Sequence, residues 1–487
     1  MLDLVIRGGR VVTPAGVGEW DVAVSGEKIV AIGDARALAG DVARVVDARG
    51  KIVIPGGIEP HAHAAFKFVY PWAQKAGHAA AGPDVMSRAC AFGGTTTIVD
   101  FANWRPGKDL FDAIERRDAL YKGQSSVDYT FHTVLVGMGT EGQTPQHTAQ
   151  VPLKLIEQIP EVVRAGFTSV KVWTTNTTAG RPKQMTDFGH VWAIMQKLAE
   201  AGGVLAVHAE DEDIVMFMSR KLHEEGRVHM RYLPEAHPSV SEDLASRRVI
   251  RLVEWTGAAV YLMHVSAKEV VQALGEARGK GLPVYGETLH HYASFTRDVY
   301  ETPEGPLYHT YPSLKQADDA ESLWRGLVEG RLSTVATDAI VCGRDLKLGG
   351  DTIEDTVGGS PAIEERVGIT FTECVAKRGM SLQRFAEVVS TNAAKILGLY
   401  PRKGVLAPGS DADIVLIDPS IRKRLSVSDL HAADHSVWAG TEIHGWPVTT
   451  ILRGTILVED GKFFGAQAGR LLGDRKTPAE VLSGAAC

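Results

Sequence analysis

The sequence has few cysteines, and their spacing does not suggest a structural framework. Four cysteines occur in 487 residues, far apart and never as a CxxC pair: Cys90, Cys342, Cys374 and Cys487. This spacing excludes a disulfide scaffold and a zinc site built from thiolates. A bound metal ion would need nitrogen and oxygen ligands, for which the 17 histidines provide candidates.

The sequence also lacks a basic stripe, a long apolar run and a targeting segment. Its 52 Lys and Arg residues are scattered and are outnumbered by 59 Asp and Glu residues, so nucleic acid is not an expected partner. No stretch approaches the roughly 18 uninterrupted apolar residues of a membrane span. The opening MLDLVIRGGRVV has neither a basic start nor a signal-type cleavage site. We expect a cytoplasmic protein without a membrane partner.

Both ends of the sequence are rich in short β-strand patterns. Residues 1–54 contain β-branched runs separated by Gly, Asp and Pro, which predict a small all-β module. The same pattern of β-branched runs and turn residues occurs again in GSDADIVLIDP and TTILRGTILVEDGKFF. We predict that residues 1–54 and 398–465 form one β-sandwich beside a central domain of residues 55–397. The C-terminal tail, 466–487, is expected to be loosely ordered from Leu472.

Between these ends, apolar β-branched runs alternate with helical patterns, which is typical of βα units around a parallel sheet. VPLKLIEQIPEVVRAG and VWAIMQKLAEAGG each predict a helix that ends at glycine. The chain is long enough for one barrel of about 250 residues and a smaller module. The predicted fold is α/β, a TIM-like (β/α)8 barrel. Its predicted strands are Ile52–Gly57, Thr95–Phe101, Tyr129–Gly137, Ser169–Trp173, Val204–Glu210, Val260–Ser266, Pro283–Leu289 and Thr334–Ile340; the first also closes the β module.

Four histidines and one aspartate follow or end these predicted strands. His61 and His63 are two residues apart in PGGIEPHAHAAF, so in an extended segment both side chains project to one side. His208 and His264 end apolar runs, and Asp338 ends RLSTVATDAI. A single buried histidine is more often a core residue than a ligand. Barrel enzymes, however, place their active sites at the C-terminal ends of the strands, so five such residues together predict a metal site.

Lys171 is an anomaly in the strand segment TSVKVW. Its neighbours Val170 and Val172 would face the opposite side of the strand, which directs Lys171 into the barrel mouth. Burial of an ammonium group is costly unless it is paired or chemically altered. The lysine therefore needs a partner or a modification.

These motifs together resemble the hydantoinase, dihydropyrimidinase and allantoinase branch of the amidohydrolase superfamily over nearly the whole chain. The matching motifs are PGGIEPHAHAAF, TSVKVW, VHAED, MHVSAKE and NAAKILGLYPRKGVLAPGSDADIVLIDP. The resemblance implies hydrolytic opening of a cyclic amide or imide, of the hydantoin or dihydropyrimidine type, with a small cyclic amide as the substrate.

The resemblance also implies two divalent metal ions, usually Zn²⁺, with Mn²⁺ or Co²⁺ possible. Carbon dioxide would convert Lys171 into a carbamate, N6-carboxylysine, that bridges both ions. A water shared by two such ions has its pKa lowered from about 15.7 toward about 7, and Asp338 would act as general base and then general acid. The implied ligands are His61, His63 and Asp338 for one ion, and His208 and His264 for the other.

The sequence departs from the family pattern around the predicted site. Asn176 stands where relatives commonly carry an oxyanion-stabilising tyrosine, and an amide can also donate to an oxyanion. Tyr311 in YPSLK takes the place of a substrate-binding serine, and we hypothesise that it reaches the same oxyanion from the opposite wall. GGSPAIEER resembles a segment that touches substrate through its backbone, which would place Ser360 near the site. Ala339 and His290 replace a histidine and a proline of relatives, which indicates an altered choice of substrate.

Two other functions remain open on the sequence alone. The same metal chemistry could hydrolyse a linear amide, carbamate or urea bond. A non-catalytic oligomeric scaffold is the alternative of another class, because some relatives keep the fold without the metal ligands. Retention of all six ligand types favours an enzyme. The family also implies a homotetramer or a homodimer.

Overall fold

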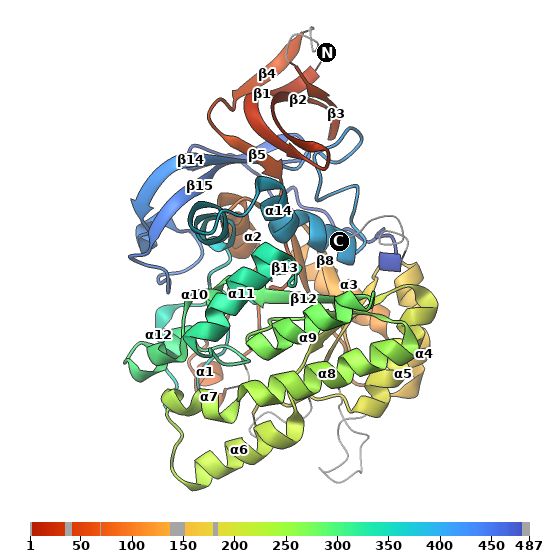
Figure 1. Cartoon of the computed structure of the whole chain (residues 1–487), viewed down its shortest axis with the longest axis vertical. Coiled ribbons are helices and arrows are strands. Elements are labelled where there is room, and N and C mark those ends of the chain that lie inside the picture. The colour runs from red at the N-terminus through yellow and green to blue at the C-terminus, as the bar shows by residue number, and fades with distance from the viewer. Residues whose placement is uncertain (1, 35–40, 69, 137–150, 179–183, 480–487) are drawn as a thin grey trace.

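The computed structural model describes residues 2–34, 41–68, 70–136, 151–178 and 184–479. The strands from the two ends of the chain lie together at one end of the molecule, and the barrel with its helices forms the rest (Figure 1). This arrangement agrees with the predicted combination of a barrel and a terminal β module.

The terminal β module is one hydrogen-bonded sheet of nine strands. Strand β14 pairs antiparallel with β5, with Ile414 opposite Pro55, so the two ends of the chain share a sheet. Buried aliphatic residues from both ends, such as Val11, Val53 and Ile451, form its core. The order is β17-β16-β15-β14-β5-β1-β2-β3, with β4 beside β1. The strands are β1 (Leu2–Thr13), β2 (Gly16–Ser25), β3 (Lys28–Gly33), β4 (Val42–Asp47), β5 (Ile52–Pro55), β14 (Ile414–Arg424), β15 (Glu442–Leu452), β16 (Thr455–Glu459) and β17 (Lys462–Phe463).

The second sheet has eight parallel strands in sequential order, which confirms the predicted (β/α)8 barrel. A parallel bridge between Ala62 and Ala339 joins the segments that follow the first and last strands. Almost every residue of these strands is buried, as expected for a parallel sheet covered on both faces. The strands are β6 (Gly57–Glu59), β7 (Thr95–Asn103), β8 (Asp128–Val134), β9 (Ser169–Trp173), β10 (Val204–His208), β11 (Ala259–Leu262), β12 (Val284–Leu289) and β13 (Thr334–Ala336).

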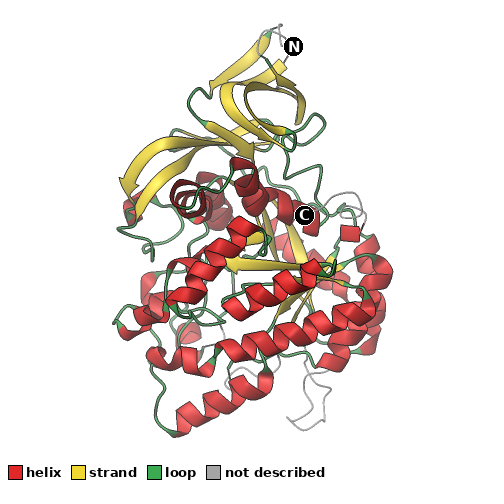
Figure 2. Cartoon of the chain, in the orientation of Figure 1, coloured by secondary structure: helices red, strands yellow, loops and turns green. Residues whose placement is uncertain are grey.

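Helices surround the barrel strands (Figure 2). Helix α4 shows why: it buries one apolar stripe that includes Leu155, Ile159 and Val162, each contributing about 1.5–3 kcal/mol. Helix α5 ends at Gly202, which has the left-handed φ of 75° that favours glycine. The helices are α1 (Pro71–Lys75), α2 (Pro83–Phe92), α3 (Leu110–Tyr121), α4 (Leu153–Arg164), α5 (Phe188–Ala201), α6 (Glu212–Glu224), α7 (Leu233–Ala236), α8 (Ser239–Thr256), α9 (Lys268–Gly279), α10 (His290–Ser294), α11 (Ala317–Glu329), α12 (Arg344–Leu348), α13 (Arg366–Thr370), α14 (Leu382–Ala386) and α15 (Asn392–Ile396). Short 3-10 helices are η3 (Met230–Tyr232), η4 (Arg297–Glu301), η5 (Gly305–Tyr308) and η8 (Val427–Asp429), and π-helical turns are η6 (Phe371–Lys377) and η7 (Glu387–Thr391).

The first predicted barrel strand, Ile52–Gly57, is wrong as a single element. Its residues Ile52–Pro55 form β5 of the terminal sheet, and the barrel begins with β6. The chain changes sheets between two consecutive glycines. The N–H of Gly56 donates to the carbonyl of Asp413, whereas the N–H of Gly57 donates to the carbonyl of Gly94.

The expected loose order from Leu472 is also wrong for residues 472–479. Leu472 is fully buried and its N–H donates to the carbonyl of Tyr129. Arg475 donates to the carbonyls of Gly166 and Phe131 from inside the protein. The remaining residues, 480–487, lie outside the described part of the chain. The predicted domain boundaries after residues 54, 397 and 465 stay predictions.

None of the helices in the described part of the chain is both long enough and apolar enough to span a membrane.

Candidate metal centre

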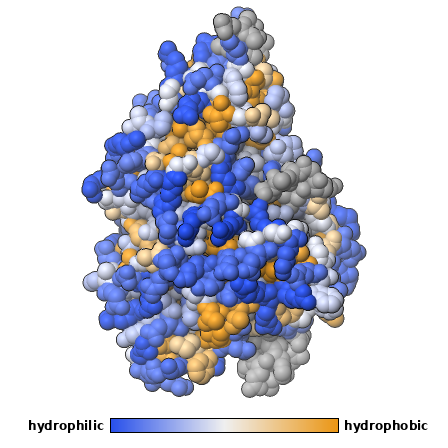
Figure 3. All heavy atoms as spheres, viewed as in Figure 1, coloured by the Kyte–Doolittle hydropathy of each residue, from blue (hydrophilic) through white to orange (hydrophobic). Residues whose placement is uncertain are grey.

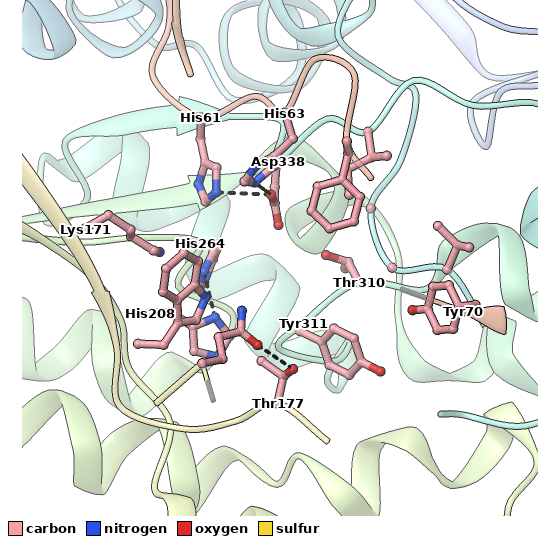
Figure 4. A pocket seen from close by; sticks show the side chains of 17 residues that line it. His61, His63, Tyr70, Lys171, Thr177, His208, His264, Thr310, Tyr311 and Asp338 are labelled. Carbon is pink, nitrogen blue, oxygen red and sulfur yellow. Dashed lines mark hydrogen bonds and ion pairs between the residues drawn. The ribbon is translucent and has the colours of Figure 1, made fainter. Parts of the chain in front are cut away.

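One pocket, open to solvent, is lined by all six predicted metal ligands. Five of them end or follow barrel strands at the C-terminal face of the barrel, and the lysine lies within a strand. Figure 4 shows that two groups of ligands face each other, with the lysine at one side. The six are His61, His63, Lys171, His208, His264 and Asp338.

The first group is made of two histidines and the aspartate. The Nε2 atoms of His61 and His63 lie 3.1 and 2.9 Å from Oδ1 of Asp338. Their potential ligand atoms all lie within 4.8 Å of one another, a spacing that could hold a metal ion. Burial raises the pKa of the Asp338 carboxyl, but the two histidines outweigh it and hold that pKa well below its usual value. The Asp338 carboxyl is therefore ionised at neutral pH.

The second group is the pair of His208 and His264. His208 is the last residue of β10, and its Nδ1 lies 3.0 Å from Nε2 of His264. Burial lowers the pKa of both imidazoles. Both rings therefore remain neutral, as metal ligands must be.

Lys171 lies in the middle of β9 and is fully buried. Its Nζ lies 3.1 Å from Sδ of Met263 and 4.7 Å from the ring centroid of Trp173. Among the described residues, no carboxylate forms an ion pair with it. Burial lowers the pKa of Lys171 to about 7, although Asp338 and Glu287 raise it. A large fraction of this amine is therefore uncharged and nucleophilic at neutral pH.

Two buried carboxylates behind the histidines were missed by sequence reasoning. Glu287 of β12 accepts a hydrogen bond from Nδ1 of His61 at 2.8 Å. Glu210 accepts one from Nε2 of His208 at 2.7 Å, and its other oxygen bonds to His237. The sequence did offer a signal for each. Glu287 is a charged residue inside a buried strand, and Glu210 is a glutamate two residues after the predicted ligand His208.

These carboxylates allow a test of whether the residues fit metal ions. A metal-ligating histidine usually donates its second ring nitrogen to a carboxylate, which fixes the tautomer and orients the ring. His61 and His208 each have this arrangement. Asp338 and Glu287 also raise the pKa of His61 to about 9 despite its burial, so this position attracts positive charge. The donor set therefore fits divalent cations.

Backbone strain marks two of the ligands. His264 and Asp338 have φ values of 41° and 48°, in the left-handed region that side chains other than glycine seldom adopt. Such conformations persist where the surrounding contacts determine them, and they cluster at functional sites. Here the N–H of His264 donates to Glu287, and Asp338 lies against two histidines.

The predicted substrate contact through Asn176 is wrong in this structure. The Nδ2 of Asn176 donates to Oε1 of Glu212 at 2.7 Å, and its Oδ1 accepts from the N–H groups of Gln184 and Met185. The amide braces its own loop and does not line the pocket. The adjacent Thr177 and the nearby Gln184 line it instead.

Tyr311 lines the pocket, but not as predicted. Its hydroxyl donates to the carbonyl of Ile353 at 3.4 Å and points away from the metal ligands (Figure 4). The hypothesis that this phenol stabilises an oxyanion at the metals is therefore wrong. The ring instead forms part of the wall, packed 5.0 Å from His237 and 4.6 Å from His309 between ring centroids.

Ser360 lies beside the site without lining the pocket. It forms a parallel bridge with Ala339, and its carbonyl accepts the N–H of Ile340. The neighbouring Gly358 and Gly359 line the pocket. His290 is buried, and its ring stacks on Trp438 at 4.3 Å, so it belongs to the packing.

Comparisons with known proteins agree with this site. The model of the amidohydrolase family matches residues 52–457. The D-hydantoinase of Geobacillus stearothermophilus is 34% identical over 471 residues, which cover 95% of this chain and 94% of the relative. The D-hydantoinase of Ralstonia pickettii is 32% identical over 483 residues, covering 98% and 99%. The crystal structure of dihydropyrimidinase from Brevibacillus agri superposes with a TM-score of 0.88 at 33% identity, covering 98% of this chain and 99% of that one.

The family model covers most of the chain, and full-length relatives exceed 30% identity. The chain belongs to the amidohydrolase family and, within it, to the hydantoinase and dihydropyrimidinase group.

Proposed function

We propose that this chain is a metal-dependent hydrolase that opens a cyclic amide or imide ring of the hydantoin or dihydropyrimidine type. The observation that carries the proposal is the convergence of four histidines, an aspartate and a buried lysine on one pocket. Relatives named D-hydantoinase and dihydropyrimidinase match over nearly their whole length. A concave pocket with a few convergent polar side chains is typical of a small-molecule site.

We propose that Lys171 is carboxylated. The lone pair of its uncharged Nζ would attack the carbon of CO2, forming an N–C bond while one C=O π bond becomes a C–O⁻ bond and the nitrogen releases a proton. The product is a carbamate with one negative charge and two ligand oxygens. Its support is the burial of an amine with a pKa of about 7 that forms no ion pair with a carboxylate among the described residues.

Two divalent ions would occupy the pocket, with Zn²⁺ as the proposed metal and Mn²⁺ or Co²⁺ as the alternatives. His61, His63 and Asp338 would hold one, His208 and His264 the other, and the Lys171 carbamate both. When bound, such ions supply a hydroxide at neutral pH and polarise the carbonyl under attack.

Asp338 would move the proton. Its Oδ1 faces His61 and His63, so the second oxygen, Oδ2, is the atom we assign to accepting the proton of the attacking water. The same oxygen would then deliver that proton to the leaving ring nitrogen. Its depressed pKa keeps the carboxylate ionised and ready for the first transfer.

The test is ring opening by protein produced with bicarbonate and Zn²⁺. Hydantoin, 5-substituted hydantoins, dihydrouracil, allantoin and dihydroorotate form the panel, and Lys171→Ala is the control. Turnover in the wild type that disappears in Lys171→Ala supports the proposal, and metal content distinguishes Zn²⁺ from Mn²⁺ and Co²⁺. Intact, metal-loaded protein that opens none of these rings would refute it, and linear amides, carbamates and ureas would become the next panel.

We further propose that the chain is a homotetramer or homodimer. Its support is a set of exposed large apolar side chains on α5, α6 and α8. Hydrophobic residues also form several patches between hydrophilic ones on the face seen in Figure 3. The residues on these helices are Trp192, Phe217, Val240, Leu244 and Trp255. The cytoplasmic location stays a prediction.

A further inference from the structure

A second buried lysine lies beside the pocket, and the chemistry above does not use it. Lys347, on α12, has no exposed surface. Its Nζ donates three hydrogen bonds, all to backbone carbonyls: His309 at 3.1 Å, Val357 at 2.6 Å and Gly359 at 2.7 Å. No acidic residue in the described ranges forms an ion pair with it.

Burial of an unpaired ammonium group opposes folding, because the cation loses its water. Burial lowers the pKa of Lys347 to about 8, and the only opposing influence is Cys342. The three carbonyl oxygens take up all three N–H donors of the ammonium group. A methionine of similar length would avoid the desolvation but would remove the ammonium donor from the Val357 and Gly359 carbonyls and leave the His309 carbonyl with the N–H of Gly359.

The three carbonyls belong to two segments that form the pocket wall. His309 precedes Thr310 and Tyr311, which lie across the pocket from Lys171 (Figure 4). Val357 and Gly359 line the pocket themselves.

The two segments are also bonded to each other and to the segment that follows Asp338. The N–H of Gly359 donates to the carbonyl of His309 at 3.0 Å. The N–H of Ile340 donates to the carbonyl of Ser360, also at 3.0 Å. Lys347 therefore binds at the junction of the pocket wall and the Asp338 segment.

Peptide planarity links the ammonium group to the pocket. In a trans peptide the C=O and the following N–H point in opposite directions. The carbonyls of Val357 and Gly359 point to Lys347, so the N–H groups of Gly358 and Ser360 point away from it. Gly358 lines the pocket, and its N–H points away from the ammonium group behind the wall.

The wall also requires glycine at position 359. Gly359 has a φ of +92°, and a Cβ there would lie 2.8 Å from Ile340. Two features therefore fix the backbone conformation of this segment: position 359 accepts only glycine, and the Lys347 ammonium group binds the carbonyls on the other side.

We propose that Lys347 is a positioning residue for substrate: by binding the carbonyls of His309, Val357 and Gly359, it turns the peptide group between Val357 and Gly358 so that the N–H of Gly358 faces the ring amide. The inference rests on the proposed function for the identity of the substrate. Because such contacts hold substrate and transition state alike, their loss raises KM and leaves kcat nearly unchanged.

The test compares Lys347→Met with Arg475→Met. Arg475 is a matched control: it is also buried and donates to backbone carbonyls, those of Gly166 and Phe131 among them, which do not line the pocket. Both variants lose a buried cation. We expect Lys347→Met to raise KM for the ring substrate about tenfold, with kcat and metal content near the wild-type values, and Arg475→Met to leave KM unchanged.

Hydrogen exchange of residues 307–313 and 355–361 gives a readout independent of turnover. These amides should exchange faster in Lys347→Met and at the wild-type rate in Arg475→Met. A wild-type KM and wild-type exchange in a folded Lys347→Met protein would overturn the inference. If Lys347→Met does not fold, Lys347→Gln, whose NH2 group keeps two of the three N–H donors, should show an intermediate KM. A wild-type KM in that variant would overturn the inference equally.

Failure of the proposed function would look different, because the wild type would then turn over no ring substrate. In that case exchange alone decides whether Lys347 positions the wall.

Discussion

Glu287 provides a sharp test of how the fold orients the metal ligands. Its Oε1 accepts from Nδ1 of His61 at 2.8 Å and from the N–H of His264 at 3.1 Å. Its Oε2 accepts from the hydroxyl of Tyr261 at 2.7 Å. In Glu287→Gln, one of these oxygens becomes an NH2 group that can only donate. If the NH2 group faces Tyr261, the hydroxyl can accept it and donate to Thr334, but His61 and His264 then donate to a neutral amide oxygen and no longer to a carboxylate. In the opposite orientation the NH2 group faces the donors of His61 and His264.

The expected loss of metal affinity in Glu287→Gln depends on where His61 carries its protons. With Glu287 accepting at Nδ1, that nitrogen keeps its proton, and a metal would displace the second proton, which His61 carries on Nε2 at neutral pH because its pKa is about 9. An NH2 group facing Nδ1 would favour the tautomer that keeps its proton on Nε2. Loss of such a carboxylate partner costs about 10- to 100-fold in metal affinity, which corresponds to about 1.4–2.8 kcal/mol.

The assay is competition for Zn²⁺ between the protein and a chromophoric chelator at fixed pH. Glu365→Gln is the control, because Glu365 is equally buried but bonds to Ser436, away from the pocket. We expect a weaker Zn²⁺ affinity in Glu287→Gln only. Wild-type affinity in a folded Glu287→Gln protein would refute the view that this carboxylate orients a metal ligand.

The other predictions concern an aromatic residue, a buried acid, the metals and assembly. Tyr311→Phe should keep kcat within about threefold of wild type, because its neutral hydrogen bond to the Ile353 carbonyl does not involve the metals; a large loss of kcat would restore the oxyanion role. Burial raises the pKa of Glu365 to about 8, so the folded state holds a proton that the unfolded state releases near the ordinary glutamate pKa of 4.5. The free energy of unfolding should therefore fall as the pH rises from about 5 to 8, by up to about 1.4 kcal/mol per pH unit. Over this range the urea midpoint of the wild type should fall relative to that of Glu365→Gln. A difference between the two midpoints that does not change with pH would contradict this. Removal of metal with a chelator should abolish ring opening and lower Tm, and added Zn²⁺ should restore both; activity that survives complete metal removal would contradict the metal mechanism. Light scattering should give a mass of two or four chains, and a monomer would refute the assembly proposal.

The sequence predicted seven of the eight barrel strands because each is an apolar β-branched run that a buried parallel sheet requires. The exception, β6, has three residues, Gly57–Glu59, and follows β5 after a single glycine. No local pattern says where the chain leaves one sheet for another, because the change depends on partners distant in sequence, Asp413 and Gly94. The burial of Leu472 is similar, since its partner Tyr129 belongs to a different βα unit.

The gathering of the six predicted metal ligands in one pocket could be predicted, because these residues lie in, end or follow recognisable strands and match family motifs. The carboxylates behind them could not, because the sequence does not say which way a buried glutamate points. The predicted position of Asn176 differs from the structure for a related reason. Its side-chain amide had several possible partners, and in the structure it donates to Glu212 at the start of α6 and does not line the pocket. Lys347 had no signal in the sequence, since backbone carbonyls are partners that every segment offers.

The arrangement beneath the pocket explains how one histidine is held so firmly. The main-chain N–H of His61 donates to Glu59 at 2.9 Å, while its ring donates to Glu287. Glu59 is held in turn by Arg366 at 3.0 Å and accepts the N–H of Thr337, one residue before Asp338. The backbone and the ring of the ligand are thus fixed by separate carboxylates from β6 and β12. Displacing either one moves the ligand even when the other stays in place. Since Glu59 also contacts the segment that carries Asp338, both ends of the first ligand group depend on one buried ion pair.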